Sequence, residues 1–455
     1  MRRKFHRQGS LFHVMPGNPI ARELAAVSEI LDANPEVLDV VFRDLAGTAR
    51  VDHGREGLSA EQVLRAAIIK QSQNLGYEEL AFHLSDSQTF RAFVRLEVNQ
   101  FPTRSSLQDN IASLNESTWE RIHAVILGYA RRQGVEDGRR VRMDTTAVET
   151  DIHAPTDSTL LRDGVRILTR WLLEGKHFSP RPVYRVRDHR RVVKRRVLTI
   201  QNARKDEVRV RAYRELLRYV ALVRGYAIEA IGVLHEWEGE RTADTLEARA
   251  LAARMERALG ILDRVIDQTE RRVLRGEKVP ASQKVVSFFE DHTDIIVKDR
   301  RQTLYGHKVC LTGGVSNLVL DLRVERGNPA DSDLFQPLVE RQVVLYGRVP
   351  RQVSADGGFA SKENLRWAKG EGIEDVCFAK RRGLRVADMV RSTWVYRKLK
   401  RFRAGIESTI SALKRAFGMD RCPWSGWAGF QRYLWSIVVS HNLFTLARLR
   451  LASAQ

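Results

Sequence analysis

The pattern of apolar and polar positions predicts helices from the start of the chain to about residue 136. Apolar residues there recur every three or four positions, the spacing of an amphipathic helix. One helix is expected from the capping-box-like stretch Ser59-Ala60-Glu61-Gln62. Others are expected at Tyr77–Leu84, Ser87–Leu96, Ser105–Leu114 and Trp119–Arg132. Short helices separated by tight turns suit either a helix-turn-helix-like DNA-binding unit or a small helical bundle.

The pattern changes after residue 136. Val141-Arg142-Met143-Asp144 predicts a short strand that ends in an acidic residue. From about residue 150 to 285 a 3.6-residue periodicity returns, and it is clearest at Val208–Glu236 and Arg241–Leu274. Gly and Pro are scarce between Val208 and Leu274, so this segment is expected to form a helical insertion and not a strand-rich one.

Strand patterns dominate from about Thr303. Tyr305–Thr312 and Leu318–Val324 flank Gly313-Gly314, which predicts a hairpin. The order continues as helix, strand, helix, strand and helix, at Asp331–Tyr346, Gln352–Ala355, a helix capped by Ser361, Asp375–Ala379 and a basic helix that carries Glu407.

Joined to the strand at Asp144, this order is that of an RNase H-like α/β domain with a mixed sheet and a large helical insertion after its first strand. The expected domains are a helical N-terminal DNA-binding domain (1–136), a catalytic domain (137–149 and 286–455) and a basic helical insertion (150–285).

The net charge of the 455-residue chain is +20, from 76 Lys and Arg against 56 Asp and Glu. Such an excess predicts a polyanionic partner, DNA, because binding to phosphates releases counterions. Twelve cations lie between Arg181 and Arg211, and ten between Lys380 and Arg403. The alternative is a solvated basic surface. In the first cluster, phosphate contacts are expected from Arg190, Arg191, Arg195 and Arg196.

Several other classes of protein are not indicated. Cys310, Cys377 and Cys422 are too far apart for a CxxC zinc signature, which favours a reducing, cytoplasmic and nucleoid-associated location. The N-terminal residues Met1–His6 lead into no apolar segment, and Trp435–Leu449 is interrupted by polar residues, so no membrane partner is expected. There is no Walker A loop and therefore no indication of ATP coupling.

Three acidic residues carry the candidate chemistry. Asp144 and Asp356 follow short apolar runs, and Glu407 lies within a basic helix. Two divalent cations held by carboxylates can clamp the attacking and leaving oxygens of a phosphoryl transfer. Magnesium prefers carboxylate oxygens, so two Mg²⁺ ions, with Mn²⁺ as an alternative, are expected at Asp144, Asp356 and Glu407, the predicted catalytic residues.

The helix around Glu407 has two faces. At about 100° per residue an apolar stripe falls on one face, at Phe402, Ile406, Ile410, Leu413 and Phe417. Arg403, Glu407 and Lys414 share a neighbouring face, where the two cations would hold phosphates beside the metal. The alternative for Glu407 is a simple salt bridge to Arg403.

Other carboxylates could replace the first ligand. Glu149 and Asp151 lie close to Asp144 in the sequence, and Glu149 is the more credible substitute. Asp321, within Leu320-Asp321-Leu322, is expected on the solvent face of a half-exposed strand.

These motifs resemble those of the DDE transposases of bacterial insertion sequences. Tyr77–Phe93 and Pro102–Leu114 are similar to their N-terminal helical domain. Asp144–Thr150 resembles the first-aspartate motif, and Ala355-Asp356-Gly357-Gly358-Phe359 resembles the second. Arg403-x3-Glu407-x6-Lys414 resembles the end of the Tyr-x2-Arg-x3-Glu-x6-Lys signature.

The resemblance has two departures. Lys400 replaces the signature tyrosine and is expected to contact DNA, and the insertion lies between the two aspartates. The resemblance implies a metal-dependent, cut-and-paste-type recombinase that binds terminal inverted repeats and target DNA as a dimer or higher assembly.

Two alternative functions remain open, a non-catalytic, domesticated DNA-binding protein and a structure-specific nuclease on the same fold. Three further side chains have two interpretations. Trp424 and Trp427 could stack on an unpaired base or pack in the core, and His153 could touch a metal or be structural.

Overall fold

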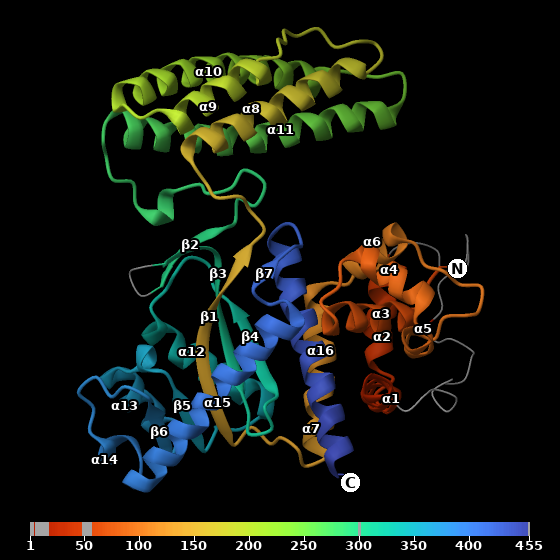
Figure 1. Cartoon of the computed structure of the whole chain (residues 1–455), viewed down its shortest axis with the longest axis vertical. Coiled ribbons are helices and arrows are strands. Elements are labelled where there is room, and N and C mark those ends of the chain that lie inside the picture. Colours follow the sequence, from red (N-terminus) through yellow and green to blue (C-terminus); the bar gives the residue numbers. More distant parts are fainter. Residues whose placement is uncertain (1–3, 5–17, 48–56, 299–301, 454–455) are drawn as a thin grey trace. The chain divides into compact units, whose positions relative to one another are not determined.

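The computed structural model describes residues 4, 18–47, 57–298 and 302–453. Of the N-terminal Met1–His6, only Lys4 falls within these residues. The chain divides into two compact units, the first made of Met1–Asp151 with His307–Gln455 and the second of Ile152–Gly306 (Figure 1). Each unit has a hydrophobic core of its own.

The first unit begins with helices, as the periodicity predicts. They are α1 (Pro19–Asp32), α2 (Val37–Ala46), α3 (Ala60–Ser72), α4 (Tyr77–Asp86), α5 (Gln88–Val94), α6 (Arg104–Ala112) and α7 (Glu116–Arg132). The capping box of α3 is confirmed, because Ser59 Oγ accepts from the Gln62 N–H and Gln62 Oε1 accepts from the Ser59 N–H. The last helix, α16 (Trp427–Ser453), packs against α1, α3 and α7, so both ends of the chain share one core.

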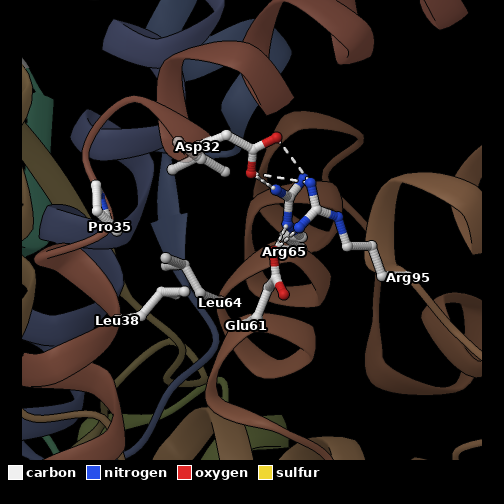
Figure 2. A pocket seen from close by; sticks show the side chains of 8 residues that line it. Asp32, Pro35, Leu38, Glu61, Leu64, Arg65 and Arg95 are labelled. Atoms are coloured by element: carbon white, nitrogen blue, oxygen red, sulfur yellow. Dashed lines mark hydrogen bonds and ion pairs between the residues drawn. The ribbon is translucent and has the colours of Figure 1, made fainter. Parts of the chain in front are cut away.

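A charged network joins three of these helices. Arg65 of α3 is only 1% exposed and binds Asp32 of α1 at 2.7 Å and Glu61 at 3.1 Å. Arg95, at the end of α5, pairs with the same two carboxylates (Figure 2). The four groups line a cavity of about 90 Å³ together with Leu64 and its neighbours. Among the described residues two cations meet two anions there, and their ion pairs link α1, α3 and the end of α5.

The first unit also contains most of a mixed sheet. Its strands are β1 (Arg140–Thr150), β3 (Gln302–Gly313), β4 (Val319–Val324), β5 (Gln352–Ala355), β6 (Asp375–Phe378) and β7 (Arg421–Cys422). The order is β2-β3-β1-β5-β6, where β2 (Asp294–Lys298) belongs to the second unit, with β4 paired to β3 and β7 paired to β1. β1, β5 and β6 are parallel, whereas β3 and β4 form the predicted antiparallel hairpin.

The prediction that the first strand ends at Asp144 is wrong. β1 continues for six residues to Thr150, with alternating burial. Its pairing with β5 does stop at Met143, and its far end pairs with β7 through Glu149 and Thr150. Asp144 therefore lies mid-strand, at the point where the parallel neighbour ends. The stretch Thr145-Thr146-Ala147-Val148 is rich in β-branched residues, which favours this continuation.

Helices complete the first unit around this sheet. They are α12 (Asp331–Tyr346), α13 (Lys362–Gly370), α14 (Val386–Met389) and α15 (Thr393–Phe417), with a 3-10 turn at Gly357–Phe359. α15 crosses β1, β5 and β6 (Figure 1). Ile406, Leu413 and Phe417 of α15 are buried, and Phe402 and Ile410 pack against the same core. The predicted apolar stripe of this helix is confirmed.

The second unit is mainly a helical bundle. α8 (Asp157–Glu174), α9 (Arg190–Asn202), α10 (Asp206–Glu236) and α11 (Thr242–Thr269) surround one core (Figure 1). A 3-10 turn at Gly175–His177 ends α8, a π-helical turn at Glu270–Leu274 continues α11, and a second 3-10 turn follows at Ala281–Gln283. The strand β2 (Asp294–Lys298) pairs antiparallel with Gln302–Gly306 of β3. It is not among the predicted strands, although Ile295-Ile296-Val297 is a run of β-branched residues that favours one. Within the described residues no helix is both long and apolar enough to cross a membrane.

Candidate active site

Parallel pairing of β1 and β5 brings the two aspartates together. Met143 is in register with Ala355, so Asp144 and Asp356 are the next residues on adjacent strands. Val141 and Met143 point into the core and are fully buried, which turns Asp144 to the opposite face. α15 covers that face, because Arg142 Nη1 donates to the Phe402 carbonyl at 3.1 Å.

A glycine lets α15 approach the strand closely. A Cβ on Gly405 would lie 2.0 Å from Arg142 Nη1, and Arg142 is itself buried and held by Asn317. Ser354 Oγ of β5 donates to the Leu399 carbonyl at 2.9 Å, which fixes the helix at a second point. These contacts place the turn of α15 that carries Arg403 and Glu407 beside the strand ends.

Arg403 joins the three predicted catalytic carboxylates. Its Nη2 lies 2.7 Å from Asp144 Oδ2 and 3.4 Å from Asp356 Oδ1. Its Nη1 donates to Glu407 Oε1 at 2.7 Å. From the sequence, a salt bridge between Arg403 and Glu407 is the alternative to a site shared by the three carboxylates. In the structure the salt bridge is present and the three carboxylates also lie around Arg403. Asp144, Asp356 and Glu407 thus converge on one guanidinium.

The exposure of the side chains increases from Asp144 through Asp356 to Glu407. The side chains of Asp144 and Arg403 are each 14% exposed, that of Asp356 is 37% exposed and that of Glu407 is 61% exposed. Burial raises the pKa of Asp144, an effect that Arg403 and the Thr145 N–H oppose and Asp356 reinforces. Burial disfavours the charge on Arg403, but the three carboxylates outweigh it and raise the pKa of Arg403.

A fourth carboxylate near the site is not identified from the sequence. Asp331 accepts from Thr145 Oγ1 at 3.4 Å and pairs with Lys308 at 3.0 Å. A Cβ on Gly358 would lie 2.4 Å from Asp331 Oδ2, so Asp331 sits against the Asp356-Gly357-Gly358 turn. Its sequence signal is its place in the first turn of α12, where acidic residues are common in helices generally.

The substitute carboxylates lie elsewhere. Glu149 pairs with Arg421 at 2.8 Å, and Asp151 lies 3.5 Å from the same guanidinium. The expectation that Asp321 faces solvent is wrong. Asp321 is 6% exposed and accepts two hydrogen bonds from Arg341, at 2.6 and 2.8 Å. Arg341 comes from α12, which covers this part of β4 and supplies a counter-charge that makes burial tolerable.

The predicted DNA-contacting residues around α15 lie in different environments. Lys400 is exposed. Lys414 donates to the Ala147 carbonyl at 2.9 Å and pairs with Asp420 at 3.2 Å, so it is tied to the far part of β1 and not to the three carboxylates. Tyr396, one turn before Lys400, donates to the Phe378 carbonyl at 3.1 Å.

The four predicted phosphate contacts of the first basic cluster lie on α9. Arg190 pairs with Asp188 at 2.7 Å and Arg196 with Glu215 at 2.9 Å. Arg191 and Arg195 are exposed, and neither has an ion pair with another described residue. Only two of the four predicted phosphate contacts are therefore without a carboxylate partner there.

The aromatic and histidine candidates have packing partners. Trp424 packs against the core and lies against the Tyr433 ring, at 5.6 Å between centroids. Trp427 meets His307 edge to face at 4.9 Å. The packing interpretation of Trp424 is confirmed. His153 lies 3.5 Å from Asp163 of α8.

The chemistry of the donor set suits a hard divalent cation. Asp144, Asp356 and Glu407 offer carboxylate oxygens, which Mg²⁺ and Mn²⁺ prefer. No group of three or more His, Cys, Asp and Glu side chains is assembled for a metal in the part of the chain that the structure describes. The three carboxylates are instead gathered around the positive charge of Arg403, a place that already favours a cation.

Comparisons with known proteins identify two parts of the chain. A family model described as "Transposase DDE domain" matches residues 265–443, and one described as "Transposase domain (DUF772)" matches residues 17–113. No curated protein and no solved structure gives a significant match. Asp356, Arg403 and Glu407 lie within the first match, and Asp144 lies between the two. The chain belongs to the DDE transposases and carries the N-terminal transposase domain typical of insertion-sequence members.

Proposed function

We propose that this transposase cleaves DNA at the ends of a mobile element and transfers the freed 3′ end into target DNA. The observation that carries the proposal is the convergence of Asp144, Asp356 and Glu407 on Arg403. The three carboxylates come from β1, the end of β5 and α15. Such convergence from separate elements is what a rigid phosphoryl-transfer site requires.

The sheet supports an RNase H-like catalytic domain. An antiparallel hairpin, β3 and β4, flanks the parallel strands β1, β5 and β6, and helices connect the later strands. In this interpretation the second unit is an insertion after the first strand, and the N-terminal helices supply sequence preference for the inverted repeats.

The metal would be held by Asp144, Asp356 and Glu407. Bound Mg²⁺ supplies stabilisation of the negative charge that develops on the attacking and leaving oxygens. With Mg²⁺ at the three carboxylates, the guanidinium of Arg403 would no longer serve as their counter-charge. It would then hold phosphate oxygens beside the cut. Arg403 Nε, buried and without a hydrogen-bond partner among the described residues, adds a further donor for that purpose.

The remaining groups position DNA. Thr145 and Asp331 buttress Asp144 and the turn at Gly358, and so hold the strand ends in place. Arg191, Arg195 and Lys400 are exposed cations suited to the phosphate backbone. Two element ends must be cut in one event, which favours a dimer or higher assembly on DNA.

A product assay tests the proposal. Linear DNA that ends in the inverted repeats flanking the coding region is incubated with Mg²⁺ and a supercoiled plasmid as target. The proposed function predicts nicks at the repeat ends and joined element–plasmid products. Cleavage of branched or unrelated DNA without joining would indicate a nuclease, and binding without cleavage under any divalent metal would indicate a non-catalytic DNA-binding protein.

A further inference from the structure

A groove of about 430 Å³ opens in the first unit at the beginnings of β1 and β5 and the start of α15. Arg140 of β1 is in register with Gln352 of β5. They lie four residues before Asp144 and Asp356, respectively. Trp394 and Lys398, from the first two turns of α15, also line it. We refer to it as the Trp394 groove.

The Trp394 groove is basic. Five cations line it, namely Arg139, Arg140, Arg351, Arg391 and Lys398, against one lining acid, Asp137. Asp137 lies near Arg139, while Arg351 and Arg391 are neutralised by Glu374 and Asp375.

Arg140 and Lys398 keep their charge uncompensated. Arg140 donates to the neutral side chain of Gln352 at 2.7 Å, and Lys398 lies over the Trp394 ring at 5.1 Å. Neither has a carboxylate partner within the described residues. Two uncompensated cations that face one cleft are suited to bind an anion.

Trp394 is unusually exposed for its size. Its relative exposure is 65%, which leaves a large aromatic face in water at the rim of a charged groove. An aromatic side chain among cations matches the way proteins bind unpaired nucleic-acid strands, since bases stack on the ring while phosphates meet the cations. Lysine is depleted at protein–protein interfaces, whereas cations without a carboxylate partner favour a phosphate backbone.

We propose that the Trp394 groove binds a single DNA strand, with an unstacked base on Trp394 and neighbouring phosphates on Arg140 and Lys398. The proposal rests on the proposed function only in taking DNA as the substrate. The groove is separate from the three carboxylates. Trp394 precedes Glu407 by roughly 20 Å along α15 at 1.5 Å per residue. The groove therefore holds DNA away from the phosphate that is cut.

Binding without divalent metal isolates the groove from catalysis. The probes are a fluorescein-labelled twelve-nucleotide oligothymidylate and a duplex of the same length, both in chelator. The variants are Trp394→Ala, Trp394→Phe and Lys398→Ala. Arg366→Ala, which removes an exposed cation of α13 outside the groove, is the matched control.

Trp394→Ala should weaken oligothymidylate binding about tenfold, within the range of one base stacked on an aromatic ring. Trp394→Phe should restore most of the affinity, and duplex binding should change less than twofold. Lys398→Ala should lower the slope of log affinity against log salt by about 0.7. Oligothymidylate should also quench indole fluorescence in the wild type more than in Trp394→Phe. This comparison does not depend on the folding of Trp394→Ala.

The proposal would be overturned if Trp394→Ala bound oligothymidylate as tightly as the wild type does, and if oligothymidylate quenched the fluorescence of Trp394→Phe as strongly as that of the wild type. A change in oligomeric state with unchanged oligothymidylate binding would also overturn it and would assign the groove to a protein partner. A wild type that never cleaves DNA, yet loses strand affinity through Trp394→Ala, would contradict the proposed function and leave the groove standing.

Discussion

Arg403 contacts all three carboxylates of the candidate site, so its removal takes away the cation that they share. Arg403→Gln leaves Asp144 buried without its cation. We expect unfolding in chelator to become easier by about 2 kcal/mol, because an unpaired buried charge is costly. Excess Mg²⁺ should restore more stability to this variant than to the wild type, where the guanidinium competes for the same oxygens.

Urea unfolding with and without Mg²⁺ measures both effects of Arg403→Gln. Arg421→Gln is the matched control, since Arg421 also bridges two carboxylates, Glu149 and Asp151, but is 53% exposed. It should cost less than about 1 kcal/mol and show no recovery with Mg²⁺. Equal behaviour of the two variants would remove Arg403 from its place at the centre of the site.

His441 predicts how stability depends on pH. Burial lowers the pKa of His441 from 6.5 to about 4, with partial compensation from Asn442. The unfolded chain therefore takes up a proton below pH 6.5 that the folded chain resists until about pH 4. Stability should be unaffected above pH 7 and should fall as pH decreases through this window, by about 2 kcal/mol at pH 5. In His441→Gln, urea unfolding should show a free energy of unfolding that no longer falls by this amount between pH 7 and pH 5. An unchanged fall would contradict the lowered pKa of His441.

At the scale of elements, the contact between α15 and β1 positions the site, and Gly405 permits it. In Gly405→Ala the added methyl meets the buried Arg142, which Asn317 and the Phe402 carbonyl hold in place. We expect a loss of about 1–3 kcal/mol in stability, typical of overpacking, and a loss of DNA cleavage. Gly225→Ala in α10 has open space and should instead stabilise by about 0.5–1 kcal/mol. Similar unfolding free energies for the two variants would argue against a close α15–β1 contact.

Elements with a strong local pattern are predictable from the sequence. The bounds of α12 and β5 agree with the apolar periodicity, and the capping box marks the start of α3. The far half of β1 carries β-branched residues that favour a strand, but its pairing is not predictable, because its partner β7 is two residues long and lies more than 270 positions away. Asp321 escapes prediction for a similar reason, since the arginine that permits its burial comes from another element.

The candidate site is predictable in composition but not in arrangement. The motifs around Asp144, Asp356 and Glu407 identify three acids, whereas their convergence on one guanidinium depends on strand register and on the angle of α15. Asp331 has no local signal beyond its place in the first turn of α12. Long-range pairing of charges is set by tertiary packing, which no sequence window contains.

For the whole molecule, the net charge of +20 predicts steep salt dependence of DNA binding. Of the four arginines of α9, two have a carboxylate partner and two have none among the described residues. Arg191→Ala with Arg195→Ala should lower the slope of log affinity against log salt by about 2, since each phosphate that a cation neutralises contributes about 0.9. Arg190→Ala with Arg196→Ala should change it less, because these two arginines already pair with Asp188 and Glu215. Identical slopes in the wild type and the first double variant would remove α9 from the DNA interface.

The central claim is that Asp144, Asp356 and Glu407 form one metal-dependent catalytic centre. Single-turnover cleavage of end DNA in Mg²⁺ tests it most directly, with Asp144→Asn, Asp356→Asn and Glu407→Gln beside Glu149→Gln as the matched control. The account predicts that each of the first three loses about a thousandfold or more in rate, the equivalent of several kcal/mol of transition-state stabilisation, while still retarding end DNA in a gel. Glu149→Gln should cleave at nearly the wild-type rate. Normal cleavage by Glu407→Gln, or loss of cleavage in Glu149→Gln alone, would contradict the account.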